Sequence, residues 1–336
     1  MIRRRFLHLA TASALATTAA CTPRVPSDNT PSRLVKPARL RAGDTVMLTC
    51  PGGPINEARL QKAVTNLEAL GLVVKIGHHV LAQNGFNAGT DSQRLEDLHA
   101  AFRDPSVKAV WPVRGGYGCT RLLPMIDFDL IRANPKLLIG YSDITALLMA
   151  FYQRTGLVGV HGPLGSSDFS DFNVSHLRAV IMEGASQHQI NWSEAGTTLL
   201  GGKARGPIVG GNLTLLAAMA GTPDGFDAKG KLVFIEDVGE APYSIDRMLT
   251  QLRQSARLDQ AKGIILGEFL DCEAEPNDLS LSLLDTLKDR LLGLGLPLVY
   301  RMPFGHGELN CSLPIGIQAE LDADAGTLRL LEAATS

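Results

Sequence analysis

The pattern of hydrophobic and polar residues along this chain predicts strands separated by helices. Short apolar runs, which favour buried strands, stand between longer stretches whose apolar residues recur at the spacing of one helix face. In the first half the expected strands are residues 45–48, 72–76, 107–112 and 137–139, and the expected helices are 56–72, 91–102 and 144–154. This alternation predicts a Rossmann-like α/β domain with a parallel sheet over residues 40–170, in which ligands bind at the carboxyl ends of the strands.

The second half begins with a less regular connecting segment, residues 171–205, and then returns to the same alternation. The expected strands are residues 231–237, 263–269, 298–300, 317–321 and 327–331, and the expected helices begin at 212, near 244 and at 279. The last two strands alternate with a period of two, which is typical of antiparallel strands with one buried face. A second domain is therefore predicted over residues 206–336.

The first 21 residues have the pattern of an export signal. Arg3, Arg4 and Arg5 precede a short apolar stretch rich in Ala and Thr, and the run from Arg3 to Leu7 resembles the core of a twin-arginine signal. The sequence before Cys21 resembles a bacterial lipobox with an unusual Thr, so Cys21 is a candidate for lipid attachment. The alternative is the amphipathic or disordered tail of a cytoplasmic protein. We expect an exported protein, periplasmic or anchored to the membrane, with the proline-containing residues 22–39 as a tether.

Composition and charge narrow the classes of function. A chain of 336 residues with 45% hydrophobic and 20% charged residues fits two globular domains. The net charge of -2, without a basic cluster beyond the N-terminus, argues against a nucleic-acid partner. The five cysteines form no paired CxxC motif, so a zinc site is not expected. An oxidising compartment would permit disulfides, but buried free thiols are the expectation.

The stretch from Trp111 to Thr145 contains the first candidate chemistry. The apolar strand 137–139 stops at Gly140-Tyr141-Ser142-Asp143, which predicts a strand, a sharp turn and a helix. A serine at such a turn presents its hydroxyl in front of helix N–H groups, as a nucleophile requires. The alternative is that Ser142 only caps the helix, because Ser is among the preferred N-cap residues.

The glycine cluster before that strand also has two interpretations. Gly115 and Gly116 follow the strand 107–112, where they could simply permit a turn with positive φ. They could also direct backbone amides at a developing oxyanion, together with the N–H of Asp143. The cluster is neither GxGxxG nor a phosphate-binding P-loop, so a nucleotide site is not predicted.

Two residues of the second domain could complete a catalytic site. Glu236 ends the apolar face of the strand 231–237, where it is either a solvated strand end or an orienting carboxylate. His306 lies between two glycines in a loop after a strand, where it is either a surface residue or a group presented to a site. Ser142, Glu236 and His306 all follow or end strands, and together they supply a nucleophile, an orienting acid and a general base.

Several motifs, in the correct order, resemble the LD-carboxypeptidase family of serine peptidases, the muramoyltetrapeptide carboxypeptidases. The resemblance extends from about residue 40 to the C-terminus. It rests on Gly89-Thr90-Asp91, Arg94, Asp97-Leu98, the glycine cluster with Arg114 and Tyr117, Gly140 to Leu147, His161-Gly162-Pro163, Gly210 to Leu213, Phe234 to Asp237, Tyr243, Asp246-Arg247-Met248 and Gly305-His306.

The resemblance implies a fold and an activity. Members of the family have an N-terminal α/β domain and a smaller C-terminal domain rich in β structure, are usually homodimeric, and act without metal or cofactor. They cleave the bond from an L-centre to the terminal D-alanine of cell-wall tetrapeptides. The motifs assign Ser142 as the nucleophile, His306 as the base and Glu236 as its orienting acid, with oxyanion donors from Asp143, Gly115 and Gly116.

Substrate binding and the competing functions stay open at this point. Arg114 is a candidate for the terminal carboxylate, since guanidinium matches carboxylate geometry, with a surface or interdomain ion pair as the alternative; Tyr117, in the same turn, is a second candidate. The microcin-immunity branch of the family, which cleaves a peptide-nucleotide antibiotic, has the same triad, but its substrate acts in the cytoplasm. An inactive exported muropeptide-binding protein would not need the triad. A nucleotide-dependent oxidoreductase fits the α/β pattern but lacks the glycine fingerprint.

Overall fold

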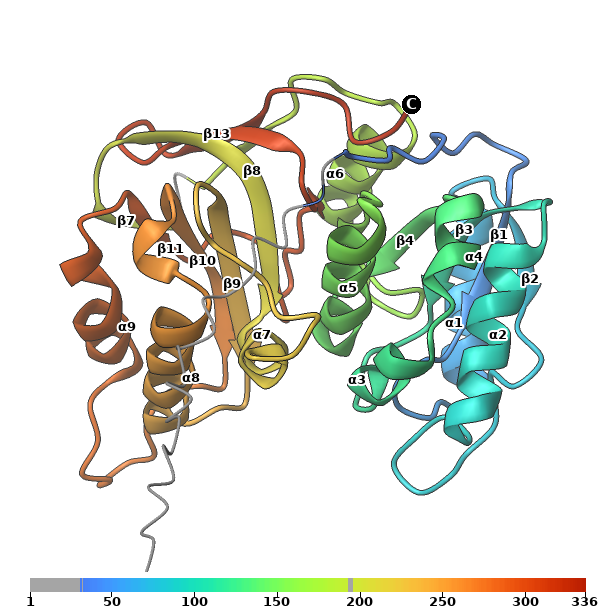
Figure 1. Cartoon of the computed structure of the whole chain (residues 1–336), viewed down its shortest axis with the longest axis horizontal. Helices are drawn as coiled ribbons and strands as arrows, with labels where there is room; N and C mark the ends of the chain where they lie inside the picture. The colour runs from blue at the N-terminus through green and yellow to red at the C-terminus, as the bar shows by residue number, and fades with distance from the viewer. Residues whose placement is uncertain (1–30, 32, 193–195) are drawn as a thin grey trace, which may run out of the picture.

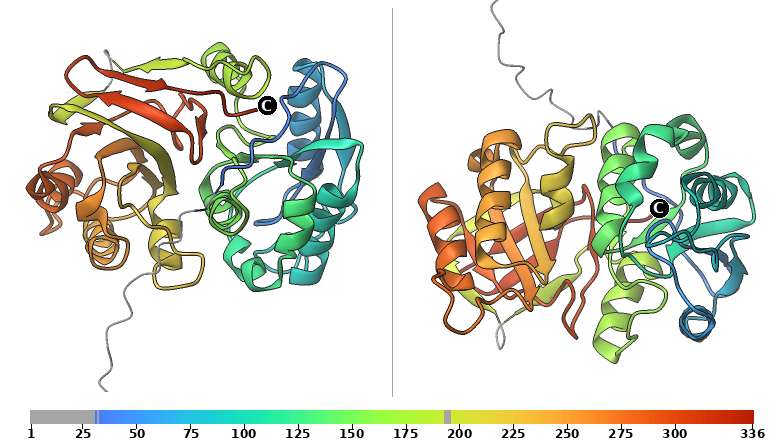
Figure 2. Two further views of the ribbon diagram at one scale, coloured as in Figure 1. Left: turned by 45° about the horizontal axis from the view of Figure 1, so that its top comes forward. Right: turned by 90° about the horizontal axis from the view of Figure 1, so that it is seen from below.

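The protein folds into two domains that lie side by side, each built on its own sheet (Figures 1 and 2). This computed structural model describes residue 31, residues 33–192 and residues 196–336. The predicted signal peptide and Cys21 lie outside the described residues. The two-domain α/β class predicted from the alternation is confirmed.

The first sheet, within the described residues, has six strands in the order β12-β5-β4-β3-β1-β2. Its five N-terminal strands are parallel, as predicted, and β12 is antiparallel to β5. The central strands are buried except at Lys108, because helices connect them across the sheet. The strands are β1 Thr45–Thr49, β2 Val73–Ile76, β3 Val107–Pro112, β4 Leu137–Gly140, β5 Val160–His161 and β12 Leu313–Pro314. The helices are α1 Glu57–Ala69, α2 Asp91–Arg103, α3 Cys119–Leu122, η1 Leu123–Met125, α4 Phe128–Ala133, η2 Ser142–Ile144 and α5 Thr145–Thr155.

The second sheet, counted over the same residues, has eight strands in the order β6-β14-β13-β8-β9-β10-β11-β7. Strands β8 to β11 are parallel, and the predicted closing strands form the antiparallel pair β13 and β14. The strands are β6 Gln189–Asn191, β7 Thr197–Leu200, β8 Lys203–Asn212, β9 Leu232–Val238, β10 Gly263–Leu270, β11 Leu298–Tyr300, β13 Gln318–Asp322 and β14 Thr327–Leu330. The helices are α6 Asp171–Ile181, α7 Leu213–Met219, α8 Pro242–Ser255, η3 Leu258–Gln260, α9 Leu283–Leu291 and η4 Leu292–Leu294.

The boundary between the two halves differs from the sequence prediction. The connecting segment 171–205 contributes α6 and the strands β6 and β7, which are the edge strands of the second sheet. In the other direction, β12 comes from the C-terminal part of the chain but pairs with β5 of the first sheet. The C-terminal part of the chain therefore contributes a short strand to the first sheet, which joins the two domains more closely than a simple linker would.

One predicted helix start in the second domain agrees with the structure, and another was wrong by four residues. The helix expected to begin near Ser244 begins at Pro242, because proline favours the first turn of a helix. The helix expected from residue 279 begins only at Leu283, where the side chain of Ser282 accepts a hydrogen bond from the N–H of Asp285 and caps the first turn.

The end of the predicted tether belongs to the folded body. Val35 donates its N–H to the carbonyl of Gly156 (2.8 Å) and forms a parallel bridge with Leu157. The C-terminal Ser336 donates its N–H to the carbonyl of Pro37 (2.9 Å), and Lys36 forms an ion pair with Glu332 at 2.7 Å. Figure 1 shows the C-terminus beside this segment. Residues 35–39, which we call the strap, therefore connect the first domain to the C-terminal end.

Two further properties concern the whole set of described residues. None of the helices described is long and apolar enough to cross a membrane. The cysteines outside the signal region are free and buried, which confirms the expected thiols, and burial raises the pKa of each thiol. They are Cys50, Cys119, Cys272 and Cys311.

Candidate active site

Ser142 lies in a strained turn between β4 and α5. Its φ of 63° falls in the left-handed region, which a residue with a side chain adopts only at an energetic cost. Neither η2 nor α5 has a side-chain N-cap, so the alternative that Ser142 caps the helix was wrong. The strand, the strained turn and the following helix form the arrangement that presents a nucleophilic serine.

The glycine turn after β3 lies directly against Ser142. A Cβ atom on Gly115 would come 3.0 Å from Ser142 Oγ and 3.1 Å from the backbone nitrogen of Asp143, so only glycine fits here. Gly116 adopts a φ of 96°, and the carbonyl of Gly115 accepts a hydrogen bond from the N–H of Gly53 at 2.8 Å. Within the described chain, the N–H groups of Gly115 and Gly116 donate to no protein acceptor, which leaves them available to a ligand.

The side chain of Asp143 fixes this turn to the nucleophile. Its carboxylate is buried, and Oδ2 accepts a hydrogen bond from the N–H of Cys119 at 2.9 Å. Burial raises the pKa of Asp143. The sequence analysis assigned a role only to the N–H of this residue and missed the role of its carboxylate. The Asp that follows Ser142 in the motif was the available signal for this role. Its hydrogen-bond partner, Cys119 at the start of α3, is far away in the sequence and could not be found from it.

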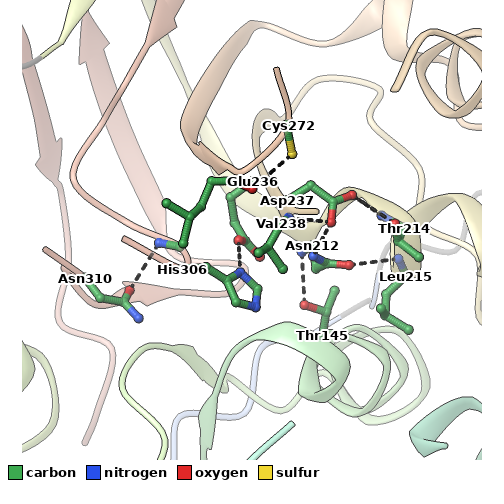
Figure 3. Close-up of polar contacts among 12 residues, drawn as sticks. Thr145, Asn212, Thr214, Leu215, Glu236, Asp237, Val238, Cys272, His306 and Asn310 are labelled. Atoms are coloured by element: carbon green, nitrogen blue, oxygen red, sulfur yellow. Dashed lines mark hydrogen bonds and ion pairs between the residues drawn. The ribbon is translucent and has the colours of Figure 1, made fainter. Parts of the chain in front are cut away.

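His306 and Glu236 form a hydrogen-bonded pair in the second domain. Nδ1 of His306 lies 2.7 Å from Oε2 of Glu236, whose side chain is fully buried at the end of β9 (Figure 3). Gly305 has a φ of 112°, and a Cβ there would come 2.9 Å from Glu236 Oε2, so a glycine is required for this close approach. The pair leaves Nε2 as the ring nitrogen that can exchange a proton with another group.

The environment of His306 sets its protonation. Burial lowers the pKa of His306, but the hydrogen bond and the negative charge of Glu236 outweigh burial and raise the pKa above its usual value. The burial of Glu236 and its contact with His306 also decide between the alternatives left open by the sequence. Glu236 is not a solvated strand end, and His306 is not a free surface side chain.

The two halves of the site meet at the domain interface. The His306 ring packs edge-on against Tyr141, the residue before Ser142, with ring centroids 4.9 Å apart. Helix α5, which follows Ser142, packs against α7 and β8 of the second domain. The N–H of Asn212 donates to Oγ1 of Thr145 at 3.1 Å, which joins the start of α5 to the end of β8 (Figure 3). The residue before the serine of one domain thus contacts the histidine of the other.

Comparison with known proteins decides the family. The family model for the LD-carboxypeptidase N-terminal domain matches residues 46–162, and the model for the LD-carboxypeptidase C-terminal domain matches residues 205–321. The chain belongs to the LD-carboxypeptidase family. It is therefore a hydrolase of the serine carboxypeptidase type, as the resemblance implied.

Several LD-carboxypeptidase relatives are similar over nearly their whole length. The probable murein peptide carboxypeptidase of Bacillus subtilis is 42% identical over 90% of this chain and 95% of its own. The murein tetrapeptide carboxypeptidase of Pseudomonas aeruginosa is 39% identical over 83% of this chain and 93% of its own. The crystal structure of muramoyltetrapeptide carboxypeptidase from Oxalobacter formigenes superimposes with a TM-score of 0.77 at 33% identity, covering 85% and 97% of the two chains. A more distant relative is the microcin C7 self-immunity protein MccF of Escherichia coli, 27% identical over 88% of this chain and 95% of its own.

Two candidate substrate-binding residues of this LD-carboxypeptidase lie in different surroundings. Arg114 lines a cleft of about 660 Å³ and donates a hydrogen bond to the carbonyl of Pro54 at 3.0 Å; no ion pair joins it to an acid among the described residues. Tyr117 is 54% exposed and packs edge-on against Phe86, with ring centroids 5.3 Å apart. No described contact joins Tyr117 to the serine, histidine or glutamate.

Two buried residues next to the site were missed by the sequence analysis as site residues. Asp237 accepts hydrogen bonds from the side chains of Asn212 (2.9 Å) and Thr214 (2.9 Å), and burial raises the pKa of Asp237 to about 6. His161 is fully buried beside Tyr141, its two ring nitrogens have no partner among the described residues, and burial lowers the pKa of His161 to about 4. Asp237 therefore holds the end of β9 in place, and His161 is neutral at physiological pH.

A metal site is not formed by this cluster. No group of three or more His, Cys, Asp or Glu side chains in the described part of the chain is arranged to hold a metal ion. The groups that the site presents are the serine hydroxyl, the imidazole, the carboxylate and the backbone amides.

Proposed function

We propose that this LD-carboxypeptidase releases the terminal D-alanine from peptidoglycan tetrapeptides through an acyl-enzyme on Ser142. The observation that supports this most is the 2.7 Å pair of His306 and Glu236, whose histidine ring packs against Tyr141, the residue before the strained Ser142. The names of relatives that are 39% and 42% identical, a murein tetrapeptide and a murein peptide carboxypeptidase, favour the same substrate class. The physiological role would be the turnover or recycling of murein.

The proposed reaction begins with the attack of Ser142 on the carbonyl of the L-centre. Nε2 of His306 takes the hydroxyl proton, while Glu236 holds the opposite side of the ring and stabilises the imidazolium. The oxyanion of the tetrahedral intermediate accepts hydrogen bonds from the N–H groups of Asp143 and the Gly115-Gly116 turn. His306 then gives its proton to the departing amine of D-alanine, and water hydrolyses the acyl-enzyme with His306 again as the base.

Substrate orientation in this proposal depends on Arg114. A carboxypeptidase must recognise a free terminal carboxylate, and Arg114 immediately precedes the glycine turn that touches Ser142. The guanidinium of Arg114 is half-buried and has no acidic partner in the described chain, so it can form a charge-assisted hydrogen bond with that carboxylate. Tyr117 would contact the substrate only at the outer rim of the turn.

A second candidate is cleavage of a peptide or aminoacyl nucleotide, as in a microcin-immunity protein. The similarity to MccF supports it, because the two chains match over most of their length, but that relative is less similar than the carboxypeptidases. An inactive muropeptide-binding protein is disfavoured by the close geometry of Glu236 and His306.

We also propose that the protein acts outside the cytoplasm as a homodimer. The basic N-terminal segment and the sequence before Cys21 favour export with a lipid anchor. Incorporation of a labelled fatty acid into the wild type, lost in Cys21→Ser, tests the anchor. Size-exclusion chromatography with light scattering on the chain from Thr22 tests the dimer.

The test of the proposed function compares two substrates. The chain from Thr22 to Ser336 is incubated with disaccharide tetrapeptide or with an aminoacyl nucleotide, and the products are followed by mass spectrometry. We expect D-alanine from the tetrapeptide and little cleavage of the nucleotide. Cleavage of the nucleotide without D-alanine release would replace the proposal with the immunity function.

A further inference from the structure

A cleft with a positive lining opens at Arg114, next to the glycine turn. It has a volume of about 660 Å³ and lies between the N-terminal part of α1 and the glycine turn. Three cations line it, Arg59, Lys62 and Arg114, whereas its other lining residues are neutral. Glu57, in the first turn of the same helix, lines a different part of the surface. The cleft is therefore suited to an anionic group of a ligand.

Only one of these cations is neutralised by the protein. Lys62 forms an ion pair with Asp168 at 2.5 Å. Neither Arg59 nor Arg114 has an acidic partner among the described residues, and the side chain of Arg114 donates only to the carbonyl of Pro54. Burial and the charge of Arg59 both lower the pKa of Arg114, which shows that the two guanidinium groups repel each other. Two like charges that face one cleft without a counter-ion favour a ligand with negative charge.

The two arginines stand at different positions relative to the chemistry. Arg114 is adjacent in sequence to Gly115, which lies so close to Ser142 that a Cβ atom on Gly115 would clash with it. Arg59 comes from the first turn of α1, and the side chain of Asn56, which caps that helix, is already occupied by the N–H of Arg59. Arg59 thus lines the cleft from α1, through its own side chain and not through the helix terminus.

We propose that Arg59 and Arg114 bind two different carboxylates of the same muropeptide. Arg114 takes the carboxylate of the terminal D-alanine, and Arg59 takes a second free carboxylate along the peptide. This inference rests on the proposed function. The terminal D-alanine has a single carboxylate, so the second carboxylate belongs to another residue of the peptide. It is either the free carboxylate on the side chain of a diaminopimelate at the third position, or the α-carboxylate of a D-glutamate that is linked through its side chain. A peptide whose second carboxylate is amidated, or replaced by a lysine side chain, loses this contact.

The test uses three tetrapeptides that differ in one group each. One carries both stem carboxylates free, one is amidated at diaminopimelate, and one is amidated at glutamate; kcat and KM for D-alanine release are measured for each. We expect the wild type to lose about 10- to 100-fold in kcat/KM on amidation at one of the two positions, mainly through KM, as for the loss of a charged hydrogen bond. For the unmodified peptide, kcat/KM of Arg59→Gln should be lower than that of the wild type by the same factor. For the peptide whose amidation lowers the wild-type kcat/KM, Arg59→Gln and the wild type should differ little. Arg59→Lys should recover part of the loss in kcat/KM on the unmodified peptide.

The matched control is Arg103→Gln, which removes an exposed arginine at the end of α2. It should leave kcat/KM for all three peptides unchanged. Equal cleavage of the three peptides by the wild type would overturn the two-carboxylate site while the proposed function stands. A uniform loss of activity in Arg59→Gln on all peptides would also overturn it, because it would show a structural role. Failure to release D-alanine from any peptide would instead contradict the proposed function, and the inference with it.

Discussion

At the scale of single residues, Ser142 combines a reactive group with an unfavourable backbone conformation. Its φ of 63° costs about 1–3 kcal/mol in a residue with a side chain. Ser142→Gly and Ser142→Ala should both abolish the reaction, but the glycine variant should be the more stable of the two by up to about 1 kcal/mol, because glycine adopts this conformation without strain. Thermal unfolding of the two variants measures the difference. An alanine variant clearly more stable than the glycine variant would show that the turn is not strained.

The pH dependence of the reaction depends on the pair of His306 and Glu236. His306 must be neutral to accept a proton, and Glu236 raises the pKa of His306 above 6.5, so kcat/KM should fall with decreasing pH through a pKa above 6.5. In Glu236→Gln burial still lowers the pKa of His306, and only the charge of Asp237 still raises it. The pKa seen in kcat/KM should therefore move to lower pH, while kcat falls about 10²- to 10⁴-fold. The control is Glu240→Gln, a nearby acid that accepts a hydrogen bond only from Thr214. If kcat/KM of Glu236→Gln falls at the same pH as that of the wild type, Glu236 does not set the pKa of His306.

The sequence could predict the residues whose position follows from the chain itself. Ser142, Glu236 and His306 were found because each follows or ends a strand, and ligands of α/β sheets bind at the carboxyl ends of the strands. The carboxylate of Asp143 and the buried ring of His161 could not be found this way. Their surroundings, the N–H of Cys119 and a cluster of aromatic rings, exist only after distant segments have packed.

At the scale of elements, the glycine turn and the nucleophile turn fit each other with no room for a methyl group. A Cβ on Gly115 would come 2.8 Å from Ser142 Cβ, closer than such atoms can approach. Gly115→Ala should therefore displace the turn and lower kcat by about 10²- to 10³-fold, as for the loss of an oxyanion donor, with a stability loss of about 1–3 kcal/mol. The matched control is Gly293→Ala, where a Cβ would meet nothing within 4 Å. Full activity in Gly115→Ala would remove the turn from the proposed oxyanion site.

The elements differ in how much of them the sequence could predict. The central strands were found because they are mainly apolar runs that are largely buried. The edge strands β6 and β7 were missed because they are short and largely exposed, so their residues carry no strong pattern. Strand β12 contains a proline and pairs with a strand far back in the sequence, which periodicity cannot reveal.

At the scale of the whole molecule, the strap fastens the first domain to the C-terminus. Its backbone contributes four hydrogen bonds, two with Gly156 and Val158 and two with Ser336. A chain that begins at Leu40 loses all four, and at about 0.5–1.5 kcal/mol each it should be less stable by about 2–6 kcal/mol than a chain that begins at Pro31. Thermal or urea unfolding of the two chains measures this. Equal stabilities would show that residues 35–39 are only a tether, as the sequence suggested.

The division of the catalytic groups between two domains makes the interface part of the chemistry. Ser142 and the glycine turn come from the first domain, and Glu236 and His306 come from the second. The contact between Thr145 and Asn212 and the packing of α5 on β8 hold the two halves together. The activity should therefore require both domains, and the family match over both agrees with this.

The most direct measurement is the release of D-alanine from disaccharide tetrapeptide by the wild type and by Ser142→Ala, each made as the chain from Thr22 and checked for an unchanged circular dichroism spectrum. The account predicts that the wild type releases D-alanine at one equivalent per peptide and that Ser142→Ala releases it at least about 10³-fold more slowly. Release by Ser142→Ala at the rate of the wild type would contradict the account.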